Sequence, residues 1–140
     1  MANGGYNIAK KKLIDGALNL GTADLRLLLV GTGYTFDPDH AFVAAVVANE
    51  LSGTGYTRVT LAGKATAQDD TNNRAEMDCN DVEYAAINAG TAKAALVFVQ
   101  VTNDSDSFLV GYFDEGGFPF VTNGGPLTLQ VNAEGLFWVA

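Results

Sequence analysis

The segment of residues 93–102 constrains the fold of this chain most, because it is apolar on both faces of any strand that it forms. Its apolar residues are Ala94, Ala95, Leu96, Val97, Phe98, Val99 and Val101. Strands that are apolar on both faces are typical of the centre of a sheet that is covered on both sides. We therefore expect this segment to be the central strand of the fold.

Short β-like segments separated by turn-forming residues occupy most of the chain after Gly53. Besides the central strand they comprise residues 57–62, 74–79, 82–87, 108–114, 127–131 and 136–139, and residues 24–30 form a further strand before Gly53. About eight strands at this spacing predict a mainly β fold, a jelly-roll-like sandwich or barrel.

Two segments in the N-terminal half predict short helices. In residues 6–18 the apolar residues recur at helical spacing, and three lysines cover the other side. Residues 39–51 show a similar spacing with Asp39 as the N-cap, although the valines in this segment favour strands. We expect one domain over residues 1–140, with residues 1–20 as a helical segment that packs on it, because no segment has the composition of a linker.

The charge of the chain limits its partners. Its 140 residues include 8 Lys and Arg against 16 Asp and Glu, a formal net charge of −8. Phosphate binding needs a surplus of basic residues, so we expect no direct nucleic-acid partner, and an anionic membrane surface is disfavoured for the same reason. Charged residues make up only 17% of the chain, which suggests that part of the surface does not face water.

The residues that could carry chemistry do not form a catalytic motif. The only histidine, His40, lies near Asp37 and Asp39, which a metal or acid–base site could use, but we favour a helix start with Asp39 as its cap. No serine lies in a nucleophile elbow, and Cys79, the only cysteine, is typical of a small core residue. We expect no enzymatic activity and no cofactor.

Two kinds of acidic segment have a structural explanation as well as a functional one. The carboxylates of Glu76, Asp78, Asp81 and Glu83 alternate with apolar residues, which favours the wet face of two strands over a glycosidase pair. Residues 69–73 and 103–106 resemble fragments of calcium loops, yet Asx-rich hairpin turns explain both. Calcium at a subunit contact stays an alternative.

Three groups of residues are candidates for contacts with other subunits. The apolar segment 136–140 would favour aggregation unless it is covered, and the aromatic loop around residues 118–120 is typical of a binding hot spot or of a plug at the end of a sandwich. The lysine cluster either solvates its helix or binds an acidic neighbour. The candidates are Lys10, Lys11, Lys12, Phe118, Phe120, Leu136, Phe137 and Trp138.

Several segments together resemble small virion proteins of tailed bacteriophages. They are Ala-Asp-Leu-Arg-Leu-Leu-Leu-Val at residues 23–30, Asp-His-Ala-Phe-Val at 39–43, Asn-Glu-Leu-Ser-Gly-Thr-Gly-Tyr-Thr-Arg at 49–58, and Val-Thr-Asn-Gly-Gly at 121–125. The resemblance implies a jelly-roll-like cement (decoration) protein on the outer surface of the capsid. Such a subunit bridges neighbouring copies of the major capsid protein, as a dimer or trimer, and is made in the cytoplasm of the host bacterium.

A second interpretation places the chain elsewhere in the virion, because similar small β proteins also occur in phage tails. It would then be a tail, minor tail or receptor-binding module that contacts glycan on the host surface. Trp138 or the loop with Phe118 and Phe120 would supply the stacking platform for a sugar ring.

Overall fold

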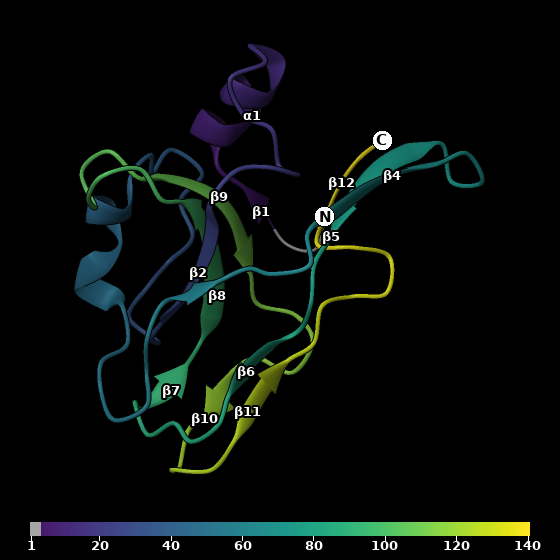
Figure 1. The fold of residues 1–140 in the computed structure, drawn as a ribbon. Coiled ribbons are helices and arrows are strands. Elements are labelled where there is room, and N and C mark those ends of the chain that lie inside the picture. Colours follow the sequence, from purple (N-terminus) through teal and green to yellow (C-terminus); the bar gives the residue numbers. More distant parts are fainter. Residues whose placement is uncertain (1–3) are drawn as a thin grey trace.

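A computed structural model describes residues 4–140, and the fold in this range is mainly β (Figure 1). The described residues form one α-helix, two short 3₁₀ turns and twelve strands, which pair in four antiparallel sheets. The expected mainly β class is therefore confirmed, although the strands are more numerous and shorter than the sequence predicts.

The largest sheet has five strands and contains the most apolar segments of the chain. In order across the sheet they are β1 (Gly4–Gly5), β9 (Phe108–Phe113), β8 (Ala94–Val99), β2 (Leu25–Val30) and β3 (Val59–Thr60). Strand β8 lies between β9 and β2, and all its residues are buried. The prediction of a central strand in residues 93–102 is confirmed.

Both faces of this sheet are covered, which explains why its strands lack a polar side. Leu27 and Leu29 belong to a core that also contains Met77, Val82 and Phe137 from the smaller sheets. On the opposite face, a second core includes Leu28, Val30, Leu96, Phe98, Tyr6, Tyr34, Val43 and Val46. Successive residues of a strand point to opposite faces, so each central strand contributes to both cores.

Three smaller sheets pack beside the main one or project from it (Figure 1). A three-stranded sheet has the order β12 (Phe137–Val139), β5 (Arg74–Asp78) and β4 (Ala65–Asp69). Strand β6 (Val82–Tyr84) pairs with β11 (Leu127–Leu129), and β7 (Thr91–Ala92) pairs with β10 (Phe120–Val121). Within residues 4–140 the sheets do not close into a barrel, since each keeps two edge strands.

Helix α1 (Asn7–Ile14) is shorter than the predicted segment of residues 6–18 and packs on β9. Gly16 follows its last turn with a φ of +74°, a conformation that ends helices and that glycine adopts without strain. The helix therefore ends before Gly21, the glycine that follows the predicted segment. Its apolar side is only partly buried: Ala9 lies in the core, while Ile14 is 88% exposed.

The predicted helix over residues 39–51 is wrong. The segment forms only the 3₁₀ turns η1 (Val43–Ala45) and η2 (Val47–Asn49), and Phe42 before them is extended. Two amides at the start of the first turn bond outside the segment: the Val43 amide donates to the Ser107 carbonyl and the Ala44 amide donates to the Asp104 carbonyl. Asp39 is not a helix cap; its Oδ1 accepts a hydrogen bond from Asn7 Nδ2 at 2.7 Å.

Candidate interaction surfaces

The C-terminal end of α1 carries the basic cluster and the most exposed large apolar side chain of the described residues. Lys11 forms an ion pair with Asp15 at 2.5 Å, and Lys10 donates a hydrogen bond to Asn7 at 3.3 Å. Lys12 lies over the ring of Phe108, 4.7 Å from its centroid. Each lysine is thus held by a neighbouring group, whereas the Ile14 side chain is exposed at the end of the helix. The ribbon shows this end of α1 standing away from the sheets (Figure 1).

Apolar side chains continue this surface beside the helix. Phe42 is partly exposed and forms an isolated bridge with Phe108, the residue that Lys12 covers. Leu13 is also partly exposed. We call Lys12, Leu13, Ile14 and Phe42 the helix surface. The sequence predicts Lys12 as a contact residue but not Ile14 or Phe42, because both belong to the apolar positions at helical spacing in residues 6–18 and 39–51, which are expected to face the core.

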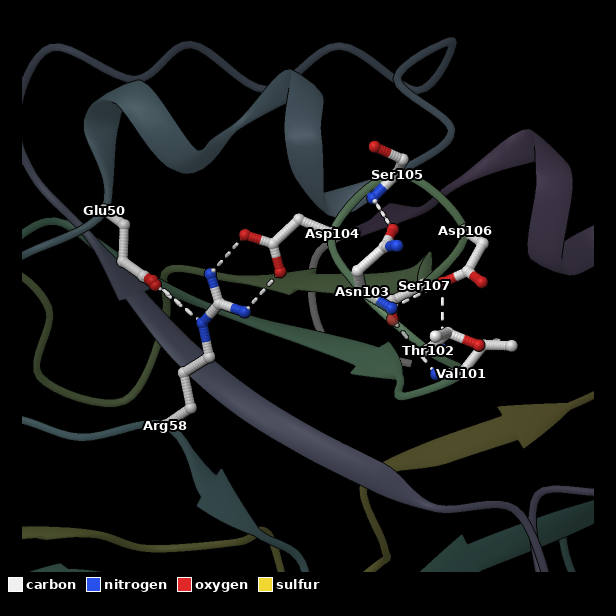
Figure 2. A network of polar contacts seen from close by, with 9 residues as sticks. All are labelled: Glu50, Arg58, Val101, Thr102, Asn103, Asp104, Ser105, Asp106 and Ser107. Atoms are coloured by element: carbon white, nitrogen blue, oxygen red, sulfur yellow. Dashed lines mark hydrogen bonds and ion pairs between the residues drawn. The ribbon is translucent and has the colours of Figure 1, made fainter.

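Arg58 fixes the loop between β8 and β9 to the rest of the protein (Figure 2). Its Nε donates to both carboxylate oxygens of Glu50, at 2.7 and 3.0 Å, and its two terminal nitrogens donate to Asp104 at 2.6 and 3.1 Å. These hydrogen bonds from Arg58 hold the pKa of Asp104 below its usual value. The guanidinium also lies 5.5 Å from the ring centroid of Phe98, so this network is part of the structural framework.

The same loop uses its polar side chains to hold its own backbone. Asp106 Oδ1 accepts from the amides of Thr102 and Asn103, and Asn103 accepts from the amide of Ser105 (Figure 2). Residues 69–73 do the same between β4 and β5, where Asp69 accepts from Asn72. Both segments are the predicted Asx-rich hairpin turns. Nowhere in residues 4–140 do three or more His, Cys, Asp or Glu side chains gather in a group that could hold a metal ion.

The C-terminal apolar segment is covered in part by its own chain. Strand β12 pairs with β5, with Phe137 opposite Met77 and Trp138 opposite Glu76. The Phe137 ring is 6% exposed and packs edge-on against Phe113 at 5.4 Å. Gly111 makes this possible, because a Cβ there would lie 2.6 Å from the Phe137 ring. Phe137 is therefore a core residue, Leu136 packs partly buried against the same core, and Val139 is exposed.

Arg74 holds the polar face of the three-stranded sheet together. Its guanidinium lies 4.9 Å from the Trp138 ring centroid and within 3.4 Å of carboxylate oxygens of Asp69, Glu76 and Glu134. One face of the indole is therefore occupied by a cation. On the other face of this sheet, an apolar hollow of about 350 Å³ lies between Leu20 and the strands.

The predicted aromatic loop forms a compact pair. The rings of Phe118 and Phe120 meet edge-on, with their centroids 4.7 Å apart on either side of Pro119, and both are partly buried against the core. Phe118 lines a cavity of about 550 Å³ whose wall includes Leu27, Val82, Phe113 and Leu129, with Asp81 and Glu115 among its polar groups. The pair thus packs against the first core, and Phe118 also borders a cavity.

His40 belongs to a chain of aromatic polar groups. Its Nδ1 lies 3.1 Å from the Tyr34 hydroxyl, which lies 2.9 Å from the buried Tyr6 hydroxyl, and its Nε2 is 4.0 Å from Asp37. Burial raises the pKa values of both tyrosines. A hydroxyl chain of this kind stabilises the second core, where Phe36 stacks on Tyr112 at 4.8 Å.

The remaining candidate groups lie where the strand alternation predicts. Asp78, Asp81 and Glu83 are exposed, whereas Cys79 is buried and free. Burial raises the pKa of the Cys79 thiol to about 11, which keeps it protonated at neutral pH. No helix in the described part of the chain is long and apolar enough to cross a membrane.

Comparisons with protein-family models, with curated proteins and with solved structures found no significant match to this chain.

Proposed function

We propose that this chain is a cement protein of a tailed-bacteriophage capsid, and that the helix surface binds the outer face of the shell. The observation that carries the proposal is Ile14, whose side chain is 88% exposed at the end of a projecting helix. Apolar side chains that project in this way gain free energy when a partner covers them. The resemblance of the sequence to small virion proteins supplies the identity of that partner, the major capsid protein.

The lysines beside the helix surface on α1 favour an acidic patch on the shell. Lys10, Lys11 and Lys12 form a basic cluster on a protein whose net charge is −8. Charge complementarity of this kind orients the subunit and excludes wrong contacts more than it adds affinity. The contact thus combines an apolar anchor, Ile14, with lysines that set its orientation.

A cement subunit needs only modest contacts. It binds the assembled shell and not its separate parts, so it stabilises assembly by mass action. Many copies on a symmetric lattice add their effects. We include in the proposal that the subunit acts as a homo-oligomer at the virion surface, and that its open antiparallel sheets are a variant of the jelly-roll-like fold of such proteins.

The test measures binding to shells of the phage that encodes the chain, after the native copies have been removed. We expect the purified protein to rebind in hundreds of copies per shell, and Ile14→Asp to weaken binding about tenfold or more, since burying an isoleucine contributes about 2 kcal/mol. Val121→Asp is the matched control, because Val121 is 76% exposed on β10, at the opposite end of the molecule from α1 in Figure 1. Equal binding of the two variants, or no rebinding of the unchanged protein, would overturn the proposal.

The cavity beside the aromatic pair favours one alternative, a tail or receptor-binding module that contacts glycan. Its volume is within the range of small-ligand pockets, about 300–1,000 Å³, and Phe118 at its edge offers a surface for a sugar ring. Trp138 is less suitable, because Arg74 already covers one face of the indole. A handful of copies per virion, together with binding of the isolated protein to host-surface glycan that Phe118→Ala abolishes, would establish this alternative instead.

A further inference from the structure

Strand β4 is an exposed sheet edge without the usual protection against pairing. It is the outer strand of the three-stranded sheet, and the residues from Ala65 to Gln68 are all exposed. Natural edge strands are usually shielded by a bulge, a proline, a charge in their middle or a covering segment. Strand β4 has the uncharged sequence Ala-Thr-Ala-Gln before its final Asp69, and its pairing with β5 is regular throughout.

The outward backbone groups of this edge are available for a further strand. Residues 65–69 form the ladder with β5, and no other backbone hydrogen bond of these residues occurs within the described chain. The ribbon shows β4 and β5 extending away from the main sheet (Figure 1). Unpaired peptide groups along a flat edge are a template for β-augmentation by another chain.

The sequence around β4 is complementary to itself in the antiparallel direction. When two copies pair about a two-fold axis at Ala67, Thr66 lies opposite Gln68 of the other copy. In the same register Lys64 lies opposite Asp70, so opposite charges meet at both ends of the paired segment. Lys64 already donates to the Ala23 carbonyl, but an ammonium group has three N–H donors and keeps two for this contact.

We propose that β4 pairs with β4 of a second copy of this chain, in the register centred on Ala67. The two three-stranded sheets then form one six-stranded antiparallel sheet with the order β12-β5-β4-β4-β5-β12. The small side chains at the centre allow close approach, and opposite-charge pairs across antiparallel strands are stabilising. A two-fold interface uses the same surface on both copies, which is the arrangement that a self-complementary strand permits.

The contact is narrow, so we expect a weak dimer in solution that becomes stable when both copies are held on a lattice. The inference rests on the proposed function for its biological role, because a dimer of this kind would bridge two shell subunits. Its test is independent of shell binding: loss of dimerisation with retained shell binding refutes only the β4 contact, and the reverse result refutes only the cement role.

Engineered cysteines test the register. Paired residues on antiparallel strands have Cα atoms about 4.5–5.5 Å apart, within the range for a disulfide. We expect Ala67→Cys to form a disulfide-linked dimer under mild oxidation with a glutathione redox buffer. In Ala65→Cys the two engineered residues lie four positions apart along the strands, about 13 Å, and cannot be joined. The unchanged protein is the control for Cys79, which is buried.

Two lysine variants with the same net charge provide the second test. Ala67→Lys places two ammonium groups opposite each other on the two-fold axis and should abolish concentration-dependent dimerisation in sedimentation equilibrium. Ala65→Lys faces Asp69 of the other copy and should retain or strengthen it. Sedimentation of the unchanged protein as a monomer up to millimolar concentration, or equal cross-linking of the two cysteine variants, would overturn the proposal.

Discussion

Arg58 and Asp104 lie 46 residues apart in the sequence and are joined by two hydrogen bonds, of 2.6 and 3.1 Å. The pair connects the segment before β3 to the hairpin loop between β8 and β9, and Glu50 joins Arg58 from a third segment (Figure 2). Two-bond pairs of arginine and carboxylate hold both groups in a fixed geometry. The network thus fixes the loop between β8 and β9. The same loop supports the 3₁₀ turns of residues 43–49, because the Asp104 carbonyl accepts from the Ala44 amide.

The first prediction concerns the stability that Asp104 contributes. Asp104→Asn removes the carboxylate charge, while Arg58 keeps its ion pair with Glu50. We expect a loss of about 1 kcal/mol in the free energy of unfolding. The value is modest because solvent screens the partly exposed carboxylate. Urea denaturation at pH 7 measures it. Glu83→Gln, an exposed change away from this network, is the control and should have almost no effect.

The second prediction is the pH dependence of the same difference. The pKa of Asp104 is lower in the folded protein than the value of about 3.9 expected in the unfolded chain. A group of this kind stabilises the fold above its unfolded pKa, and the contribution is lost as the pH falls through the folded pKa. The stability difference between the unchanged protein and Asp104→Asn should therefore be constant from pH 6 to 8 and shrink below about pH 4. A difference that stays constant down to pH 3 would contradict this.

The third prediction uses the buried hydroxyl chain. Tyr34→Phe leaves the Tyr6 hydroxyl without the hydrogen bond that it makes at 2.9 Å, and an unsatisfied buried hydroxyl costs about 1–3 kcal/mol. Removing both hydroxyls leaves no unsatisfied partner at Tyr6. We therefore expect the double variant Tyr6→Phe, Tyr34→Phe to be less destabilised than the sum of the two single variants, in a double-mutant cycle measured by urea denaturation. Strict additivity would show that the two hydroxyls are not coupled.

The parts of the fold that the sequence predicts correctly are those where hydrophobicity alone decides. Residues 93–102 are apolar on both sides, as are residues 24–30 apart from Asp24 and Arg26, and both segments form central strands that contribute to two cores. The Asx-rich turns were also predicted, because the side chains of Asp69 and Asp106 bond to nearby amides regardless of distant contacts.

The errors fall where distant contacts override a local pattern. Residues 39–51 have helical spacing, but the amides of Val43 and Ala44 bond to the loop after β8, a partner that spacing does not show. Strand β4 was missed because its alanines and threonine lack apolar alternation, and it is a strand only because β5 pairs with it. Phe137 was a candidate for outside contacts, yet the space left by Gly111 places its ring in the core.

The fourth prediction separates the core role of β12 from any surface role. Phe137→Ala should destabilise the protein by about 3 kcal/mol, because it removes a buried ring and leaves a cavity. Val139→Ala, two residues further on the same strand, should change stability by less than about 0.5 kcal/mol, because Val139 is 64% exposed. Urea denaturation of both variants measures this. Similar losses would mean that β12 stabilises the fold through its backbone pairing with β5 and not through the Phe137 ring.

The fifth prediction compares two glycines that share a left-handed backbone. Gly16 and Gly55 have φ values of +74° and +79°, so alanine brings a similar conformational cost of about 1 kcal/mol at each. Their surroundings differ: a Cβ at Gly16 would meet nothing within 4 Å, whereas one at Gly55 would lie 1.8 Å from the Ala86 carbonyl oxygen. The backbone cannot move away easily there, because the Asn88 amide donates to the Thr54 carbonyl at 2.8 Å. Gly55→Ala should therefore lower the free energy of unfolding by about 3 kcal/mol or more. Gly16→Ala should lower it only by the conformational cost of about 1 kcal/mol. Thermal and urea unfolding of the pair measure the difference, and equal losses would show that the chain around Ala86 yields to the added methyl group.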